Sequence, residues 1–307
     1  MRVPRSMLSH TTPDLPEASP PPGAEAVLAT FAALARLRRE VAASLPDPRP
    51  GLAYDPDRFA AGTPLLAHAD PEGIVAATLA AGPDLLAGLA GIFPAIAREA
   101  ILLAEALAER PELADGLADA VLNGREDLTE SLSADIGLAP AALAFLAREL
   151  LATVLRRETA TLSPLADDAL WQKPTCPICG SVPDLGLLKE HREPSEFLVA
   201  KAGRLQLHCS LCGHLWRFPR LKCLACGEGD QEKLDVLIPA GRDRERIHTC
   251  STCGRYLIVL NRVESVSDRE VDPDVAPAGL SHLDAAAQAK GFVPLCPAPW
   301  NQFGEDE

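Results

Sequence analysis

Eight of the nine cysteines in this chain of 307 residues fall into four units that share the pattern Cys-x-x-Cys-Gly. The units are Cys176-Pro-Ile-Cys179-Gly, Cys209-Ser-Leu-Cys212-Gly, Cys223-Leu-Ala-Cys226-Gly and Cys250-Ser-Thr-Cys253-Gly. Two intervening residues allow a tight turn that directs both sulfurs at one point, and the glycine allows the positive φ with which the chain leaves the turn. A tetrahedral site needs four ligands and each turn gives two, so four turns predict two four-sulfur metal sites.

The order of the units along the chain favours one pairing of the three that are conceivable. Joining the first unit to the second and the third to the fourth leaves intervening segments of 29 and 23 residues, each with room for a small sheet. Joining the second to the third instead leaves 70 residues between the first and the fourth, and longer closures cost more entropy. We therefore expect site one to comprise Cys176, Cys179, Cys209 and Cys212, and site two to comprise Cys223, Cys226, Cys250 and Cys253.

Other uses of paired cysteines fit this chain less well. A thioredoxin-like redox pair begins a helix in a βαβ unit, whereas turns and strands surround these pairs. Structural disulfides belong to oxidising compartments, and packed free thiols do not explain the repeated spacing. Four sulfurs suit zinc or iron. The aromatic residues Trp216, Phe218 and Tyr256 can screen sulfur from water, which tunes an iron site, or simply fill a small core.

Four histidines and the ninth cysteine accompany the motifs. His208, His214 and His248 lie close in sequence to cysteines of the four units, and each could replace a thiolate ligand. Because eight cysteines already complete two sites, we expect these histidines on the surface or around the ligands. His191 stands in a charged loop between the ligands of site one, and Cys296 lies outside the repeat. We assign no role to either.

The elements that must position the motifs divide the chain in two. Apolar residues recur at helical spacing from about residue 25 to residue 162, which predicts five to seven helices, with a break or kink at Pro94. Short alternating segments follow, and a last helix is expected near residues 281–291, with Ser281 as its cap. The predicted fold class is α + β. The predicted divisions are a Pro-rich arm (1–23), a helical domain (24–168), two rubredoxin-like Cys₄ modules (169–218 and 219–265) and an extension (266–307).

Charge and hydropathy narrow the classes of function. The net charge is −14, and residues 1–168 carry 13 Arg, no Lys and 24 acidic residues, so the surface repels nucleic acid. Residues 201–222 hold five cations and no acid, a pattern that by itself indicates nucleic-acid binding. We interpret these cations mainly as balancing the negative charge of the cysteine thiolates. The N-terminus lacks the apolar core of a secretory signal, and no charge-free apolar run reaches the roughly 18 residues of a membrane helix. We expect a cytoplasmic protein without nucleic-acid binding or membrane insertion.

The layout resembles the FdhE family of formate dehydrogenase accessory proteins. The most specific stretch is "LHCSLCGHLWRFPRLKCLACG", supported by "CPICGSVP" before it, "CSTCGRYLIVL" after it and "LSHLDAAAQAKGF" near the end. The resemblance implies a cytoplasmic maturation factor, not an enzyme, that binds the catalytic subunit of formate dehydrogenase before export and holds iron in rubredoxin-like sites, with zinc as the alternative. A rubredoxin-like electron carrier is the second hypothesis, and a nucleic-acid-binding zinc ribbon is the third.

Overall fold

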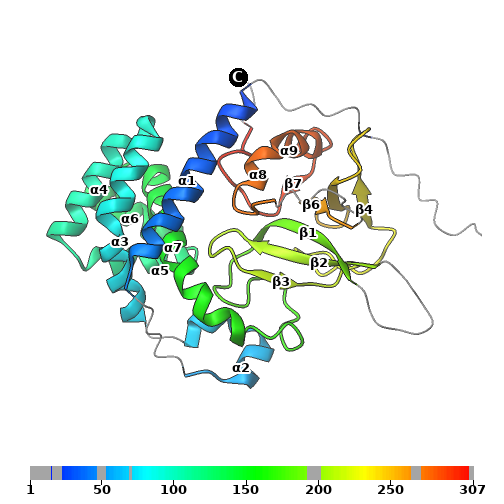
Figure 1. Cartoon of the computed structure of the whole chain (residues 1–307), viewed down its shortest axis with the longest axis horizontal. Coiled ribbons are helices and arrows are strands. Elements are labelled where there is room, and N and C mark those ends of the chain that lie inside the picture. The colour runs from blue at the N-terminus through cyan, green and yellow to red at the C-terminus, as the bar shows by residue number, and fades with distance from the viewer. Residues whose placement is uncertain are drawn as a thin grey trace, which may run out of the picture.

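The computed structural model describes residue 15 and residues 23–46, 53–68, 71–191, 202–263 and 271–303. Its N-terminal half is helical, as predicted, and packs against one side of a β-rich C-terminal region (Figure 1). The α-helices of the described part of this half are α1 (Ala24–Ser44), α2 (Pro56–Ala61), α3 (Pro71–Ile92), α4 (Ala97–Glu109), α5 (Leu113–Leu122), α6 (Glu126–Ile136) and α7 (Pro140–Leu162). Short 3₁₀ turns are η1 (Leu65–His68), η2 (Pro94–Ile96) and η3 (Ser163–Leu165).

Helix α3 ends at the predicted break and contains an internal proline. The chain does break at Pro94, between α3 and α4. The helix before the break begins at Pro71 and continues through Pro83. A proline there removes one backbone hydrogen bond, and tertiary packing of α3 against α1, α4 and α7 offsets that loss.

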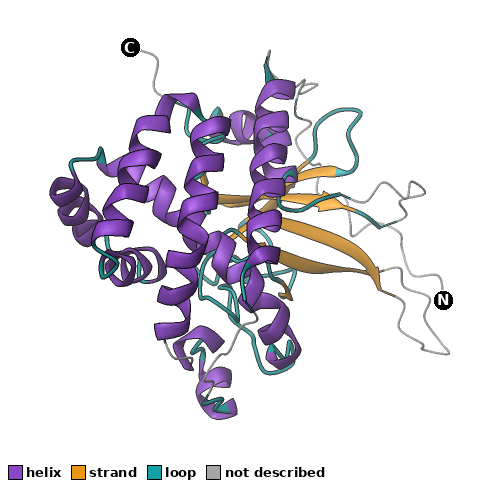
Figure 2. Ribbon diagram, turned by 60° about the vertical axis from the view of Figure 1, so that its left-hand side comes forward, coloured by secondary structure: helices purple, strands orange, loops and turns teal. Residues whose placement is uncertain are grey.

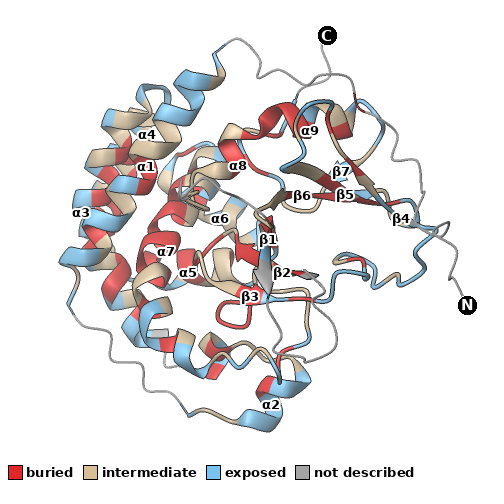
Figure 3. Cartoon of the chain, turned by 45° about the vertical axis from the view of Figure 1, so that its right-hand side comes forward, coloured by how far each residue is buried: buried red, intermediate tan, exposed pale blue. Residues whose placement is uncertain are grey.

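Helix α7 is the central element of the bundle. Twelve of its residues are buried, and the helix contacts α1, α3, α4, α5 and α6 (Figure 3). One buried charge on α7, Glu149, is paired with Arg38 of α1. A buried carboxylate without such a partner is strongly unfavourable, so this ion pair fixes how α1 lies across α7.

The β-rich region is one sheet built from two three-stranded ribbons. The first ribbon holds β1 (Pro183–His191), β2 (Ala202–Cys209) and β3 (Leu215–Arg217), and the second holds β4 (Leu234–Leu237), β5 (Glu245–Cys250) and β6 (Arg255–Asn261). Each ribbon is antiparallel, but β1 pairs with β6 in parallel, so the strand order is β3-β2-β1-β6-β5-β4. Figure 2 shows the strands, in orange, beside the helices. At the join Gly186 faces Val259, where a built Cβ would lie 2.8 Å from a valine methyl carbon. The two ribbons therefore meet so closely that a larger residue at 186 does not fit.

The remaining elements are α8 (Ala276–Gly279), α9 (Ser281–Gln288) and β7 (Val293–Pro294). Helix α9 covers one face of the second ribbon, α8 contacts α1 and α9, and β7 pairs with β6. The predicted last helix is present, but Ser281 is its first residue rather than its cap, which is Leu280. Leu15 of the Pro-rich arm is buried among the same side chains and forms a bridge with Pro239.

The hydrophobic core has two parts, which do not follow the predicted domain boundaries. One part joins the helical bundle to the first ribbon and to Leu257 and Val259 of β6, and it includes Cys176, Cys179, Cys209 and Cys212. The other joins the second ribbon and the opposite face of β1 to α9. The boundaries at 168, 218 and 265 stay predictions, and the sheet crosses the second of them without interruption.

One described helix segment, Glu72–Ile92 within α3, is long and apolar enough to cross a membrane. A second candidate exists only if Glu126–Ile136 and Pro140–Leu165 count as one span, and these are bent by 107°. The α3 segment packs against three helices of the bundle. That is the environment of a core helix in a water-soluble protein.

Candidate metal centres

All four Cys-x-x-Cys-Gly units form the same turn. The glycines Gly180, Gly213, Gly227 and Gly254 have φ between 69° and 80°, the left-handed region that glycine adopts without strain. In each unit the glycine N–H donates to the carbonyl oxygen of the first cysteine, at 2.9–3.2 Å. In the first three units the N–H of that cysteine donates to the residue two positions after the second cysteine, at 2.7–2.9 Å. The local sequence thus fixes the turn without help from the surroundings.

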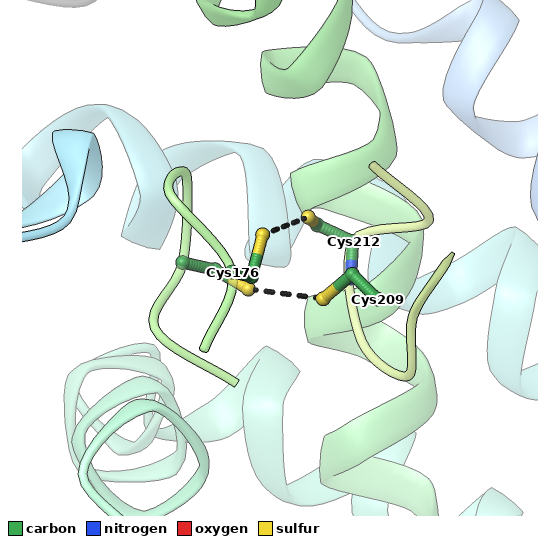
Figure 4. A group of neighbouring side chains, drawn as sticks. Cys176, Cys209 and Cys212 are labelled. Carbon is green, nitrogen blue, oxygen red and sulfur yellow. Dashed lines mark hydrogen bonds between the residues drawn. The ribbon is translucent and has the colours of Figure 1, made fainter. Parts of the chain in front are cut away.

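Site one is where the first two turns meet. The Sγ atoms of Cys176 and Cys212 are 3.6 Å apart, and those of Cys179 and Cys209 are 3.4 Å apart (Figure 4). All four sulfurs lie within 4.8 Å of one another. Backbone N–H groups of Ile178, Leu211 and Cys212 point at sulfur, each at 3.4 Å. Such N–H groups stabilise thiolate charge.

The helical half encloses site one. The second turn packs against α7, where Arg148 donates to the carbonyl of Ser210 at 2.6 Å and Thr159 donates to that of Cys212 at 3.3 Å. From the other side, the N–H groups of Leu65 and Leu66 in η1 donate to the carbonyls of Pro177 and Ile178, both at 2.9 Å. The four cysteines are at most 6% exposed. Site one is therefore part of the contact between the two halves of the protein.

A buried network of charges lies beside site one. His208, the residue before Cys209, bridges Asp184 at 2.7 Å and Asp274 at 3.0 Å. Asp274 also accepts from Arg156 of α7 at 2.6 Å. Burial alone would lower the pKa of His208, but the two carboxylates outweigh it and raise that pKa to about 10. His208 is thus a cation at neutral pH, held between two carboxylates.

Site two is formed by the last two turns and is far more open. The Sγ atoms of Cys223 and Cys253 are 3.6 Å apart, and those of Cys226 and Cys250 are 3.8 Å apart. These four sulfurs also lie within 4.8 Å of one another. Cys223 and Cys250 are buried, whereas Cys253 is half-buried and Cys226 is exposed. The two centres therefore share their local geometry and differ in their access to solvent.

Each group can hold a tetrahedral metal ion. Metal–sulfur bonds of ~2.3 Å place the sulfurs of a regular tetrahedron ~3.8 Å apart, and the closest sulfur pairs in the two groups span 3.4–3.8 Å. Burial raises the pKa of the Cys176 and Cys209 thiols, so a cation is needed to keep all four sulfurs ionised. The donor set suits zinc and iron equally, and iron stays a prediction.

The other residues singled out in the sequence lie around these centres rather than in them. Among the described residues no histidine joins either group. Nδ1 of His214 lies 3.1 Å from Ser163 Oγ, and Cys296 is half-buried outside both groups. His248 lies on β5, and burial followed by the charges of Arg246 and Arg220 lowers its pKa to about 4. The His191 side chain lies outside what the structure describes.

The three aromatic residues expected near sulfur lie in two different places. Trp216 and Phe218 are buried in the core that contains site one. Tyr256 instead faces α9, where its hydroxyl donates to Asp284 at 2.6 Å. The contribution of Asp184, Asp274 and Arg156 was not foreseen, because isolated acids and arginines far apart in the chain carry no motif.

Comparisons with known proteins agree with this arrangement. No family model matches the chain. It is 30% identical over 123 residues to "Protein FdhE homolog" of Aquifex aeolicus, covering 40% of each chain. It is 31% identical over 121 residues to "Protein FdhE homolog" of Shewanella baltica, covering 39% of this chain and 36% of that one. The matched region thus spans about two fifths of the length of these curated relatives.

A solved structure extends the similarity to most of the chain. The crystal structure of the FdhE protein from Pseudomonas aeruginosa superposes with a TM-score of 0.60 at 25% sequence identity, over 89% of this chain and 92% of that one. The helical half, the β-rich region with two four-cysteine groups, the named relatives and this neighbour agree with one another. Over most of its length the chain is similar to FdhE proteins.

Proposed function

We propose that this protein is a cytoplasmic accessory protein for formate dehydrogenase, that it is not itself an enzyme, and that it binds the catalytic subunit of that enzyme before export. Similarity to FdhE proteins over most of the chain is the observation that carries the proposal. Two clusters that can each hold a metal ion support it.

The two metal centres would have different tasks in such a protein. Cys176, Cys179, Cys209 and Cys212 would hold the first ion inside the contact between helices and sheet, where it stabilises the fold. Cys223, Cys226, Cys250 and Cys253 would hold the second ion near the surface, where a partner can reach it. Iron would allow one-electron chemistry at either centre, whereas zinc would be redox-inert.

An anaerobic pull-down tests the proposal. The tagged catalytic subunit of formate dehydrogenase is incubated with the wild-type protein, with a Cys223→Ser/Cys226→Ser variant, and with a Cys296→Ser variant as the control. We expect the wild type and the control to be retained and the site-two variant to be retained less, because loss of two ligands unfolds the turns of the second ribbon. No retention of the metal-loaded wild type would refute the proposed function.

A rubredoxin-like electron carrier is the second candidate, and the exposure of Cys226 favours it. An electron must enter and leave near the surface, and site two offers that access whereas site one does not. Metal analysis with a visible absorption spectrum separates the candidates. A native protein that holds zinc at both centres and shows no visible absorption would exclude electron transfer.

A further inference from the structure

A cavity of about 720 Å³ opens beside site two. It lies against one face of the second ribbon, below the turn that carries Cys223, and Cys250 lies at its wall. Ligand-binding cavities in proteins commonly have volumes of about 300–1,000 Å³. The described residues that line it therefore enclose enough space for a short stretch of another molecule.

The floor of this cavity is a part of the sheet that the rest of the described chain covers incompletely. Val236, His248 and Leu257 stand in one row across β4, β5 and β6, and all three line the cavity. Leu257 is buried in the core that contains site one, whereas Val236 and His248 are partly exposed. On the opposite face Ile247 and Ile258 pack against α9. The second ribbon is therefore covered at β6 and more open at β4 and β5.

The rim of the cavity is cationic. Its charged lining residues are Arg220, Lys222, Lys233, Arg246, Arg255 and Lys290, opposed by Glu232 and Asp235. Within the described part of the chain none of the six cations forms an ion pair with a carboxylate. Arg220 and Arg255 donate instead to the backbone carbonyls of Gly203 and Pro294. Glu228 interacts electrostatically with Lys233, and Asp243 with Arg246. Six cations against two lining acids on one concave surface nevertheless favour an anionic ligand.

The thiolates of site two do not account for all of this charge. Four thiolates with one divalent ion carry a net charge of −2, and with a ferric ion −1. The cations and acids that line the cavity sum to +4. The loaded site therefore leaves the cavity positive. In addition, Arg246 Nε and His248 Nε2 are buried without a hydrogen-bond partner among the described residues.

In the first ribbon, other parts of the chain cover the metal-binding turns. Its metal turns pack against α7 and η1, and Arg148 and Thr159 bind their carbonyls. The second ribbon repeats the turns and the strands, but on its cavity face Val236 and His248 are only partly buried by the described part of the chain. The surface of the first ribbon is thus covered within the chain, whereas part of the second ribbon stays open.

We infer that this cavity binds an acidic segment of a partner protein, with carboxylates against the cationic rim and an apolar side chain against Leu221 and Val236. The apolar floor favours a peptide over a purely inorganic anion, because phosphate groups gain nothing from it. This inference deepens the proposed function by naming a surface and its chemistry. It rests on that function only for the identity of the partner.

A peptide-binding measurement tests the inference on the full-length, metal-loaded protein. The probe is a fluorescein-labelled eight-residue peptide of alternating Glu and Leu, and the matched probe alternates Gln and Leu. Two exposed cations of the rim are reversed in Lys233→Glu/Lys290→Glu. The control, Arg36→Glu/Arg98→Glu, makes the same change of net charge on exposed positions of α1 and α4.

We expect anisotropy to show binding of the Glu–Leu peptide, weakened tenfold or more by the cavity variant and less than twofold by the control. Equal binding of the two peptides, or equal effects of the two variants, would overturn the inference. So would a lack of binding by the Glu–Leu peptide, and calorimetric binding of inorganic tripolyphosphate in its place would indicate a phosphate site.

The same variants in the pull-down separate this inference from the proposed function. Retention of both variants by the catalytic subunit would reject the cavity as the docking surface while the accessory role stands. If the peptide binds but the catalytic subunit does not retain the wild-type protein, the proposed function is rejected while the cavity stands as a peptide-binding site.

Discussion

The glycines of the four Cys-x-x-Cys-Gly units share one backbone conformation but have different surroundings. This difference predicts how much stability is lost when each glycine is replaced. A methyl group built on Gly213 would lie 2.5 Å from Nη1 of Arg156 and 3.3 Å from Asp274. On Gly180 the nearest atom is a ring carbon of Pro64 at 3.3 Å. Gly213→Ala must therefore displace the Arg156 guanidinium, whereas Gly180→Ala requires an adjustment of a few tenths of an ångström.

The magnitudes follow from what each substitution disturbs. A left-handed alanine costs ~1 kcal/mol in either turn. Gly213→Ala in addition separates Arg156 from Asp274, which are 2.6 Å apart, with side chains only 14% and 12% exposed. Losing one partner of a buried ion pair costs ~3 kcal/mol or more. We expect Gly213→Ala to lower the free energy of unfolding by ~4 kcal/mol and Gly180→Ala by ~1 kcal/mol.

Urea unfolding of the zinc-loaded protein, followed by tryptophan fluorescence, measures both variants with the same reporters. Trp171 and Trp216 are buried in the core that contains site one. A double-mutant cycle with Arg156→Ala isolates the contact, because Gly213→Ala should cost only ~1 kcal/mol once the guanidinium is gone. Equal costs for the two glycines, or a cycle with no coupling, would refute the reasoning.

Two further predictions concern pH and metal loss. Burial raises the pKa of Asp284 to about 7, against ~3.9 in an unfolded chain, so its contribution to stability is complete below pH ~4 and lost as the pH rises to 7. Asp284→Asn keeps an acceptor for Tyr256 and should therefore raise the free energy of unfolding at pH 8, by at most ~4 kcal/mol, and leave it nearly unchanged at pH 4. An equal effect of the substitution at both pH values would contradict this. A chelator should remove one equivalent of metal quickly, from site two with its exposed Cys226, and the second slowly, since the cysteines of site one are at most 6% exposed. A single phase of release, followed by chelator absorbance, would show that burial does not separate the sites.

The local parts of the candidate centres were accessible to sequence reasoning. The Cys-x-x-Cys-Gly turn is set by neighbours within six residues, and its glycines indeed have positive φ. The grouping of cysteines followed from closure lengths, and the structure brings the same two sets of four together. Helical periodicity likewise located the bundle, because the buried face of an amphipathic helix requires apolar residues at a regular spacing of three to four positions.

The parts that sequence reasoning missed depend on distant residues without a pattern. The parallel pairing of β1 with β6 joins residues more than 70 positions apart. The contact of Arg156 with Asp274 spans 118 positions. Pro83 lies inside α3 although local rules favour a break there, because packing in the bundle outweighs the lost hydrogen bond. Such contacts depend on the complete tertiary fold, so no short sequence motif predicts them.

Site one is buried and site two is partly exposed, and this difference determines which substitutions can test function separately from stability. A change at Cys176 or Cys212 disturbs the core that joins the helices to the sheet, so any loss of partner binding would follow from lost stability. A change at Cys226, or at the cations of the cavity beside it, leaves that core in place. Partner binding is therefore best tested at site two, and stability at site one. The internal repeat itself supplies the comparison, because the same turn occurs in both places with the same backbone geometry.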